Sequence, residues 1–311
     1  MAGSNCTPAT EFSLMGFTED LVTQLTLFLM FLLVYLLTIL GNLGIIALIR
    51  ASPLLHSPMY YFLGNLAFVD ICSSTIIVPK VLADLLSEKK GIAYAGCMAQ
   101  LFIYDLFGMT ECFLLATTAY DRYMAICHPL VYPLFMSPKC CLQLVIGSYL
   151  MGFINGVGQT ISMSSLSFCR SNVLNLFFCD ISPLILLSTS DTTLSHLILR
   201  TSASLFGVSS CLVVLISYMA IISAILSIRS AKGKCKAFST CTSHLTTVSI
   251  FYGAALFMYL KPSSGSSGKD KWTVVLYTVV TPMLNPLIYS LRNKEVKEAL
   301  RRLANQSACQ C

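Results

Sequence analysis

Three carboxylates lie inside long apolar stretches of this chain, where an unpaired charge is costly. Asp70 and Glu111 occupy the middle of their stretches, and Asp105 lies nearer to one end of the stretch that it shares with Glu111. Two acids that face one hydrated pocket either bind a cation such as sodium or share a proton. The alternative is a pair of neutral, hydrogen-bonded acids that only fixes the packing. We favour an ion or proton site at Asp70 and Glu111, and we expect no other cofactor.

Seven apolar stretches must position these carboxylates. The chain has 311 residues, of which 56% are hydrophobic and only 11% charged, so a water-soluble core cannot hide its apolar surface. A helix needs roughly 20 apolar residues to cross a bilayer, and only helices or closed barrels satisfy their backbone there. Barrel strands alternate in polarity, and these stretches do not. The sequence predicts an all-α membrane protein, a seven-transmembrane helix bundle with spans at about Leu25–Ile49, Pro58–Val78, Cys97–Met124, Leu142–Ser162, Leu197–Ile228, Phe238–Leu260 and Thr273–Leu291.

The distribution of lysine and arginine sets the expected orientation. With the N-terminus outside, nearly all of the net charge of +6 falls on the inner loops and tail. This asymmetry explains the basic balance without a nucleic-acid partner, and attraction to anionic inner-leaflet lipid adds to it. Asn5 begins an Asn-Cys-Thr glycosylation acceptor on the predicted outer side. We therefore expect a multi-pass plasma-membrane protein with an extracellular N-terminus and a cytoplasmic C-terminus.

The expected organisation is one membrane domain with two short appendages. Residues 1–24 form an extracellular tail, residues 25–291 the seven-helix domain and residues 292–311 a cytoplasmic tail. In the cytoplasmic tail, Val296, Leu300 and Leu303 recur at helical spacing among basic residues. That pattern predicts a short amphipathic helix on the inner membrane surface, with membrane lipid as its partner. The terminal Cys309 and Cys311 are open to lipidation, although we prefer a plain cytosolic tail.

Short motifs narrow the class of membrane protein. Asp121-Arg122-Tyr123 closes the third span, Asn285-Pro286-Leu287-Ile288-Tyr289 closes the seventh, and Cys97 begins the third. Together with Asn42 and Asp70, these residues resemble the motifs of rhodopsin-like G-protein-coupled receptors. Further phrases, spread over essentially the whole chain, resemble the signatures of odorant receptors: PMYYFLGNL at 58–66, AYDRYMAIC at 119–127, Ser217-Tyr218, KAFSTCTSHL at 236–245 and PMLNP at 282–286.

The resemblance implies a set of residues for activation and G-protein coupling. Arg122 is then the coupling arginine, held by Asp121 in the resting receptor and released to pair with Tyr218 and Tyr289. The alternative is an arginine that only sets the topology. Tyr252 stands where many such receptors have a tryptophan switch, or is an ordinary core aromatic. The implied partner is a stimulatory, olfactory-type heterotrimeric G protein that raises cyclic AMP, and the full set is Asp121, Arg122, Tyr123, Tyr218, Tyr252, Asn285, Pro286 and Tyr289.

The resemblance also implies a small apolar cavity for volatile odorants between the outer halves of spans three, five, six and seven. Each lining position alone is more often plain core packing. Asp105 is the polar exception, because it either binds an amine or a hydroxyl group of the ligand, or pairs with Arg200 or a tyrosine at the outer rim. The candidate ligand-binding residues are Tyr104, Asp105, Gly108, Met109, Ser202, Phe206, Tyr252, Ala255, Leu256, Tyr259, Val275 and Thr278.

Two of the 14 cysteines, Cys97 and Cys179, match the bridge that ties the third span to the long outer loop in this class. Odorant receptors usually carry two more cysteines in that loop. Cys169 matches one of them, but Thr189 stands where the other is expected, so Cys169 is either free or paired with Cys6. No motif of an intramembrane protease, zinc enzyme or serine hydrolase is present, and no paired repeats of a transporter appear. We therefore expect a receptor and not an enzyme.

Overall fold

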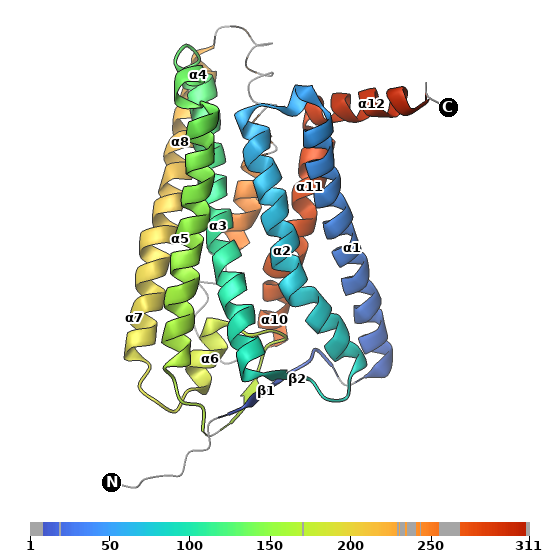
Figure 1. Cartoon of the computed structure of the whole chain (residues 1–311), viewed down its shortest axis with the longest axis vertical. Helices are drawn as coiled ribbons and strands as arrows, with labels where there is room; N and C mark the ends of the chain where they lie inside the picture. Colours follow the sequence, from blue (N-terminus) through green and yellow to red (C-terminus); the bar gives the residue numbers. More distant parts are fainter. Residues whose placement is uncertain are drawn as a thin grey trace.

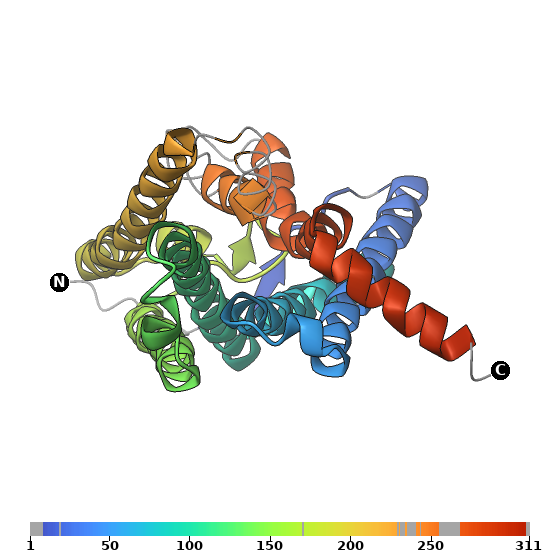
Figure 2. The ribbon, with the colours of Figure 1, turned by 90° about the horizontal axis from the view of Figure 1, so that it is seen from above.

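The structure is a computed structural model that describes residues 9–308, except residues 19, 170, 229, 231–233, 235–240, 243 and 255–267. For residues 268–270, 289–292, 294, 303, 304 and 306–308 it describes the backbone alone. Long helices run side by side, α12 (Lys294–Ala308) lies across one end of them, and a small sheet lies at the other (Figure 1). We call these the α12 end and the sheet end. Seen along the bundle, α12 projects outward from it (Figure 2).

Each predicted span is largely helical where the structure describes it. The first four are α1 (Leu21–Ala51), α2 (Pro58–Leu86), α3 (Tyr94–Cys127) and α5 (Pro138–Ser164). The fifth joins α7 (Thr193–Ser202), the π-helical turn η2 (Ala203–Val208) and α8 (Ser209–Ser227), and the sixth is helical over residues 244–254. The seventh joins α10 (Gly268–Val275), the π-helical turn η3 (Leu276–Val280) and α11 (Thr281–Arg292). Short helices connect the spans: η1 (Pro53–Leu55), α4 (Tyr132–Phe135) and α6 (Ile181–Leu187).

Several helix ends differ from the prediction by a few residues, and the start of α1 and the end of α2 show how local features set them. α1 begins at Leu21, inside the predicted tail, because the Asp20 carboxylate caps it by accepting the Thr23 N–H at 2.9 Å. This hydrogen bond and one from the Thr23 hydroxyl lower the pKa of Asp20. α2 continues through Pro79 to Leu86, past the expected end at Val78. A proline removes one helical hydrogen bond, and membrane helices tolerate that loss.

α1 shows the inverse of the burial pattern of a water-soluble helix. Its polar Thr38 and Asn42 are each only 1% exposed, whereas Leu29 and Leu40 are 58% and 67% exposed. The Asn42 side-chain amide donates to the backbone oxygen of Pro282 in α11 at 3.1 Å. Leucine on the surface and polar contacts between helices are what a lipid solvent favours. Among the described residues, five helical segments are long and apolar enough to cross a membrane.

The helices α3 and α5 pack closely against each other at two glycines of α5. A Cβ atom at Gly152 would collide with the Thr110 hydroxyl and with the backbone oxygen of Leu106. A Cβ atom at Gly156 would lie 3.0 Å from the backbone oxygen of Phe102. Glycine therefore lets the two backbones approach closely, and this contact fixes the helix that carries Asp105, Glu111 and Arg122.

We predict that Gly152→Ala lowers the melting temperature of the purified receptor, although alanine is the better helix former. The added methyl group meets a backbone oxygen that cannot rotate away, and overpacking of this kind costs about 1–3 kcal/mol. Gly147→Ala is the matched control, because a Cβ atom there meets nothing within 4 Å, and we expect equal or higher stability by up to about 1 kcal/mol. Equal melting temperatures for the two variants would contradict the close packing.

A three-stranded sheet closes the sheet end and was not foreseen from the sequence. β1 (Glu11–Leu14) lies between β2 (Gly91–Ala93) and β3 (Val173–Leu174), antiparallel to β2 and parallel to β3. Phe12 and Leu14 of β1 are buried in one apolar cluster with Cys97 and Cys179. Part of the predicted N-terminal tail is therefore a folded cap on the bundle. Strands of two to four residues are too short to show a periodic pattern.

Candidate functional site

A buried ion pair lies at the α12 end of α3. Arg122, 9% exposed, donates through Nε to Oδ2 of the fully buried Asp121 at 2.9 Å, and through Nη2 to the same oxygen. The hydroxyl of Tyr132, in α4, donates to the other carboxylate oxygen at 2.7 Å. Burial and the adjacent Asp121 carboxylate raise the pKa of Tyr132, which keeps this hydroxyl a donor. The sequence did not single out Tyr132, because only the fold of the α3–α5 connection brings it to Asp121.

A second polar contact joins α8 to the sixth helix near this ion pair. The Tyr218 hydroxyl lies 2.5 Å from Nδ1 of His244, and the two rings stack with centroids 5.8 Å apart. Tyr218 is 5% exposed and His244 only 1%. The resemblance implied that the Tyr218 hydroxyl pairs with Arg122 in an activated receptor. In this structure the Tyr218 hydroxyl contacts His244 instead, and Arg122 is bonded to Asp121. No role of His244 was predicted from the sequence.

The remaining coupling candidates are distributed along the same half of the bundle. The Tyr123 hydroxyl lies 2.9 Å from Nε2 of His128, just beyond the end of α3. Pro286 lies within α11, where its ring closely approaches Gly41 of α1. Asn285 is 2% exposed and contacts Asp70. For Tyr289 the described part is its helical backbone in α11.

The two mid-bundle carboxylates are brought together as the sequence suggested. Asp70 is fully buried and Glu111 is 6% exposed, and their charges lie close enough to interact. Asn285 donates through Nδ2 to Oδ2 of Asp70 at 2.9 Å. Oδ1 of Asp70 and Oε1 of Glu111 are buried without a hydrogen-bond partner among the described residues, as is the hydroxyl of Ser74. Several unpartnered oxygens in one place form the donor set that a hard cation prefers.

The α3 ligand candidates lie towards the sheet end. The Tyr104 ring packs edge-on against Phe178 of the loop after β3, with centroids 5.2 Å apart. Asp105 has a buried Oδ2 that finds no hydrogen-bond partner in the described part of the chain. A Cβ atom at Gly108 would meet nothing within 4 Å, so space is present beside this glycine. Met109, one residue further along α3, is partly buried.

The ligand candidates of the fifth and sixth helices, Ser202, Phe206 and Tyr252, already contact other residues of the bundle. Ser202 donates its hydroxyl to the side-chain oxygen of Asn155 in α5, so its polar group is already bonded within the bundle. Phe206 packs edge-on against Phe113 of α3, with centroids 6.1 Å apart. The Tyr252 hydroxyl donates to the Ser210 hydroxyl at 3.0 Å and approaches the backbone oxygen of Cys112 at 3.4 Å. Tyr252 therefore joins the third, fifth and sixth helices through one group.

The seventh-helix candidates lie mainly in core contacts. Val275 is 5% exposed and belongs to an apolar cluster with Phe31, Ile77 and Phe178. Thr278 is 3% exposed and donates its hydroxyl to the backbone oxygen of Val274 at 2.8 Å. The other ligand candidates, Ala255, Leu256 and Tyr259, lie outside the described residues, as does the glycosylation candidate Asn5.

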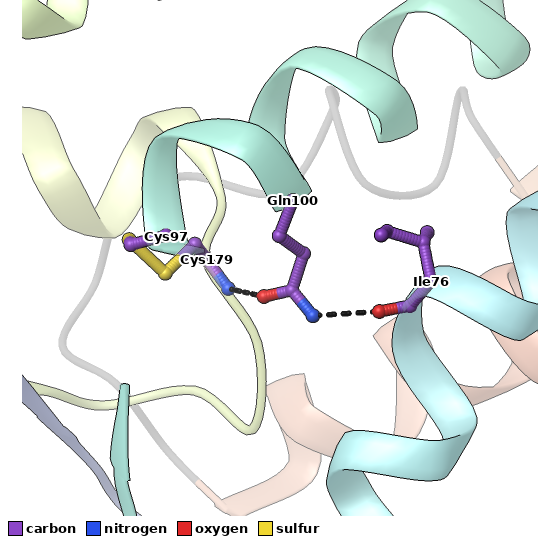
Figure 3. The surroundings of a disulfide bond; sticks show 4 residues. All are labelled: Ile76, Cys97, Gln100 and Cys179. Carbon is purple, nitrogen blue, oxygen red and sulfur yellow. Dashed lines mark hydrogen bonds between the residues drawn. A yellow bond between two sulfur atoms is a disulfide. The ribbon is translucent and has the colours of Figure 1, made fainter. Parts of the chain in front are cut away.

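A disulfide between Cys97 and Cys179 ties the outer loop to α3, as the resemblance implied. Gln100, one turn along α3, reinforces this anchor (Figure 3). Its Oε1 accepts the backbone N–H of Cys179 at 2.9 Å, and its Nε2 donates to the backbone oxygen of Ile76 in α2 at 2.9 Å. The 3% exposed Gln100 thus joins α2, α3 and the loop. This role of Gln100 was not predicted from the sequence, although an amide inside an apolar span was a usable signal.

The state of Cys169 and the contacts of Thr189 show how the outer loop is held where a second bridge was in doubt. Cys169 is disulfide-bonded, so it is not the free thiol that was one interpretation; the other interpretation involves Cys6, which lies outside the described residues. Thr189, where a cysteine was expected, donates its backbone N–H and its hydroxyl to the backbone oxygen of Ser167 at 2.9 and 3.0 Å. Hydrogen bonds therefore hold the loop at the position of the missing cysteine.

The arrangement of the helices defines the class of protein. The fold matches that of squid rhodopsin with a TM-score of 0.72 at 18% sequence identity, over 91% of this chain and 81% of that one. The helices therefore have the fold of squid rhodopsin, an all-α helix bundle.

Sequence comparison places the chain within that class. The profile of the olfactory receptor family matches residues 31–307. Olfactory receptor 5G3 of Homo sapiens is 52% identical over 303 residues, which are 97% of this chain and 96% of the relative. Olfactory receptor-like protein COR4 of Gallus gallus is 53% identical over 304 residues, 97% of each chain. The chain belongs to the olfactory receptor family and is a receptor, not an enzyme.

Proposed function

We propose that this receptor binds small volatile odorants in the sheet-end half of the bundle and activates a stimulatory heterotrimeric G protein, which raises cyclic AMP. The observation that carries the proposal is the buried Asp121–Arg122 pair at the opposite end. Removal of a charge pair from water costs free energy. An arginine that only set the topology would have a lower free energy with its guanidinium group extended into water, so the burial of Arg122 favours the coupling role. The hydrogen bond from Tyr132 to Asp121 stabilises this ion pair, which supports its role as a resting-state contact that breaks on activation.

The proposed orientation places the sheet end outside the cell and the α12 end in the cytoplasm. Asn5 then carries the proposed glycan on the outer side, and α12 lies at the inner membrane surface. In α12, Val296 and Ala299 face the bundle with 1% and 0% exposure, whereas Lys297 and Arg301 are exposed. Exposed basic side chains on such a helix suit contact with anionic lipid head groups. A tag at the N-terminus should be labelled on intact cells, and one at the C-terminus only after permeabilisation.

The mechanism follows from a difference in affinity between two arrangements of the same bundle. A ligand shifts the population only if it binds the active arrangement more tightly than the resting one. Tyr252 supports such a link, because its hydroxyl joins Ser210 of α8 and Cys112 of α3 midway along the bundle. Movement of the sixth helix towards a ligand would change this contact and, about two helical turns further along the helix, the contact between Tyr218 and His244.

The test of the function is a screen of a few hundred volatile compounds in cells that express the receptor with a cyclic AMP reporter. We expect agonists whose response disappears in cells that lack the stimulatory G-protein α subunit. A response that persists in those cells, or solute uptake without any G protein, would overturn the proposal.

The position of the ligand cavity is tested with glycine substitutions. Gly108→Val extends a side chain into the space beside α3, so we expect weaker potency of the agonists found in the screen. Gly158→Val is the matched control on α5, because a Cβ atom there also meets nothing within 4 Å. Equal potencies in the two variants would move the cavity away from Gly108.

We further propose that Asp70 and Glu111 bind a sodium ion or share a proton. The buried oxygens without partners support this site, because a cation or a proton would satisfy them. We predict that Asp70→Asn removes any effect of extracellular sodium on agonist potency. Asp84→Asn is the control within the same helix, since Asp84 already pairs with Lys80 at the sheet end. A sodium effect of the same size in Asp70→Asn would contradict the ion site.

A further inference from the structure

A second pair of carboxylates meets at the sheet end, and the sequence did not connect its two members. Asp105 lies eight residues after Cys97 in α3, about two helical turns deeper in the bundle. Asp180 directly follows Cys179 in the outer loop, so the Cys97–Cys179 bridge places both acids. Gln100 lies between Cys97 and Asp105 along α3 and accepts the backbone N–H of Cys179 (Figure 3). The disulfide and this hydrogen bond therefore fix the loop that carries Asp180 on the sheet-end side of Asp105.

Neither carboxylate has a cationic partner among the described residues. Oδ2 of Asp105 is buried and accepts no hydrogen bond from the described residues, and the Asp180 carboxylate lies close enough to act on it electrostatically. Arg200, which the sequence left open as a partner, is exposed on α7 and forms no ion pair with Asp105. Burial raises the pKa of Asp180, and the nearby backbone N–H groups of Ile181 and Ser182 partly offset this rise. Two like charges in this setting repel, and a cation between them would relieve the repulsion.

Each of the two acids has an aromatic residue close to it in the sequence, and these two aromatic residues are in contact. Tyr104 precedes Asp105, Phe178 precedes Cys179, and the two rings are in edge-to-face contact with centroids 5.2 Å apart. Phe178 is 1% exposed. Aromatic faces attract organic ammonium groups, and the same rings present apolar surface to a hydrocarbon chain. A metal ion fits less well, because no group of three or more histidine, cysteine, aspartate or glutamate side chains suited to a metal occurs in the described part of the chain.

We propose that Asp105 and Asp180 bind the ammonium group of a small organic amine, so that protonated amines are the agonist class of this receptor. This inference rests on the proposed odorant-receptor function and names its ligand. Asp105 supplies the buried oxygen, Asp180 the second carboxylate from the loop, and the rings of Tyr104 and Phe178 flank the ammonium. The hydrocarbon part of the ligand then extends towards the space beside Gly108, one turn along α3.

The experiment compares a series of linear and cyclic primary amines with the alcohols of the same carbon skeletons, using the cyclic AMP reporter at neutral pH. We expect amines to activate the unaltered receptor. Asp105→Asn should weaken amine potency by about tenfold or more, the loss of a charge-assisted hydrogen bond, and Asp180→Asn should weaken it less. Asp191→Asn is the matched control, because Asp191 is an exposed loop carboxylate bonded to Thr193. Surface labelling of each variant separates potency from receptor abundance.

The outcomes distinguish this inference from the function on which it rests. Activation by neutral volatiles but never by amines would overturn the amine site and leave the odorant-receptor function standing. Amine potency unchanged in both Asp105→Asn and Asp180→Asn would do the same, and would assign the acids a shared proton instead. No response to any volatile compound, with normal surface expression, would count against the proposed function itself.

Discussion

Replacement of Arg122 by alanine is expected to abolish agonist-evoked cyclic AMP per receptor at the cell surface. Arg122 is the buried cation at the α12 end, and its release from Asp121 is the event that the proposed coupling requires. Loss of one partner of a buried ion pair costs about 3–5 kcal/mol, so surface receptor should also fall. Tyr132 still donates to Asp121 in this variant, which limits the destabilisation. Cyclic AMP is therefore measured together with surface label.

Asp121→Asn should change the signal in the opposite direction. The amide has the shape of the carboxylate and retains an oxygen for the Tyr132 hydroxyl, but it no longer pairs with Arg122 as an ion. We expect raised basal cyclic AMP, because Arg122 is then free of its lock. Arg302→Ala is the control, since this exposed α12 arginine pairs with Glu298 at the surface. A normal agonist response in Arg122→Ala would contradict the coupling role.

Loss of the Cys97–Cys179 bridge is the second large effect that we expect. The bridge closes a loop with a sequence separation of 82 residues, and closure of a loop of that size is worth about 4 kcal/mol. It also anchors the loop that carries Asp180 and Phe178. We therefore predict that Cys97→Ser removes most surface receptor and most of the agonist response of the remainder, measured by surface labelling and cyclic AMP.

A matched cysteine substitution separates this effect from the loss of any thiol. Cys72 in α2 is a free, partly buried cysteine, so Cys72→Ser should leave both readings close to those of the unaltered receptor. Gln100→Leu should give an intermediate result, because it removes two hydrogen bonds of the same anchor but leaves the covalent bond. Full activity of Cys97→Ser at normal surface levels would show that the bridge does not hold the ligand site.

The sequence could reveal the helices because a lipid solvent acts on each span separately. Backbone groups in a bilayer are satisfied within one helix, so about 20 apolar residues are enough to predict a span. The same reasoning placed Asp70 and Glu111 as costly buried charges, and the structure brings them together. The ends were less exact, because Asp20 and Pro79 act locally and their effects depend on the neighbouring turns.

The contacts between segments that are distant in the chain could not be read in this way. The strand β1 pairs with β2 and β3 from two different loops, and such short strands carry no periodic signal. Tyr132 reaches Asp121 only because the α3–α5 connection turns back towards α3. His244 reaches Tyr218 only because two helices pack side by side.

The sequence by itself determined that the apolar spans lie in lipid, where these spans fall and which receptor family the chain resembles. Apolar length and short motifs are properties of contiguous residues, so they can be recognised without the tertiary structure. The tertiary structure decided which polar groups share a partner. It bonded Ser202 to Asn155, within the bundle, and it set Asp180 beside Asp105 while leaving Arg200 at the surface. The physical reason is that a buried polar group is defined by what surrounds it in space, and residues far apart in the chain supply those surroundings.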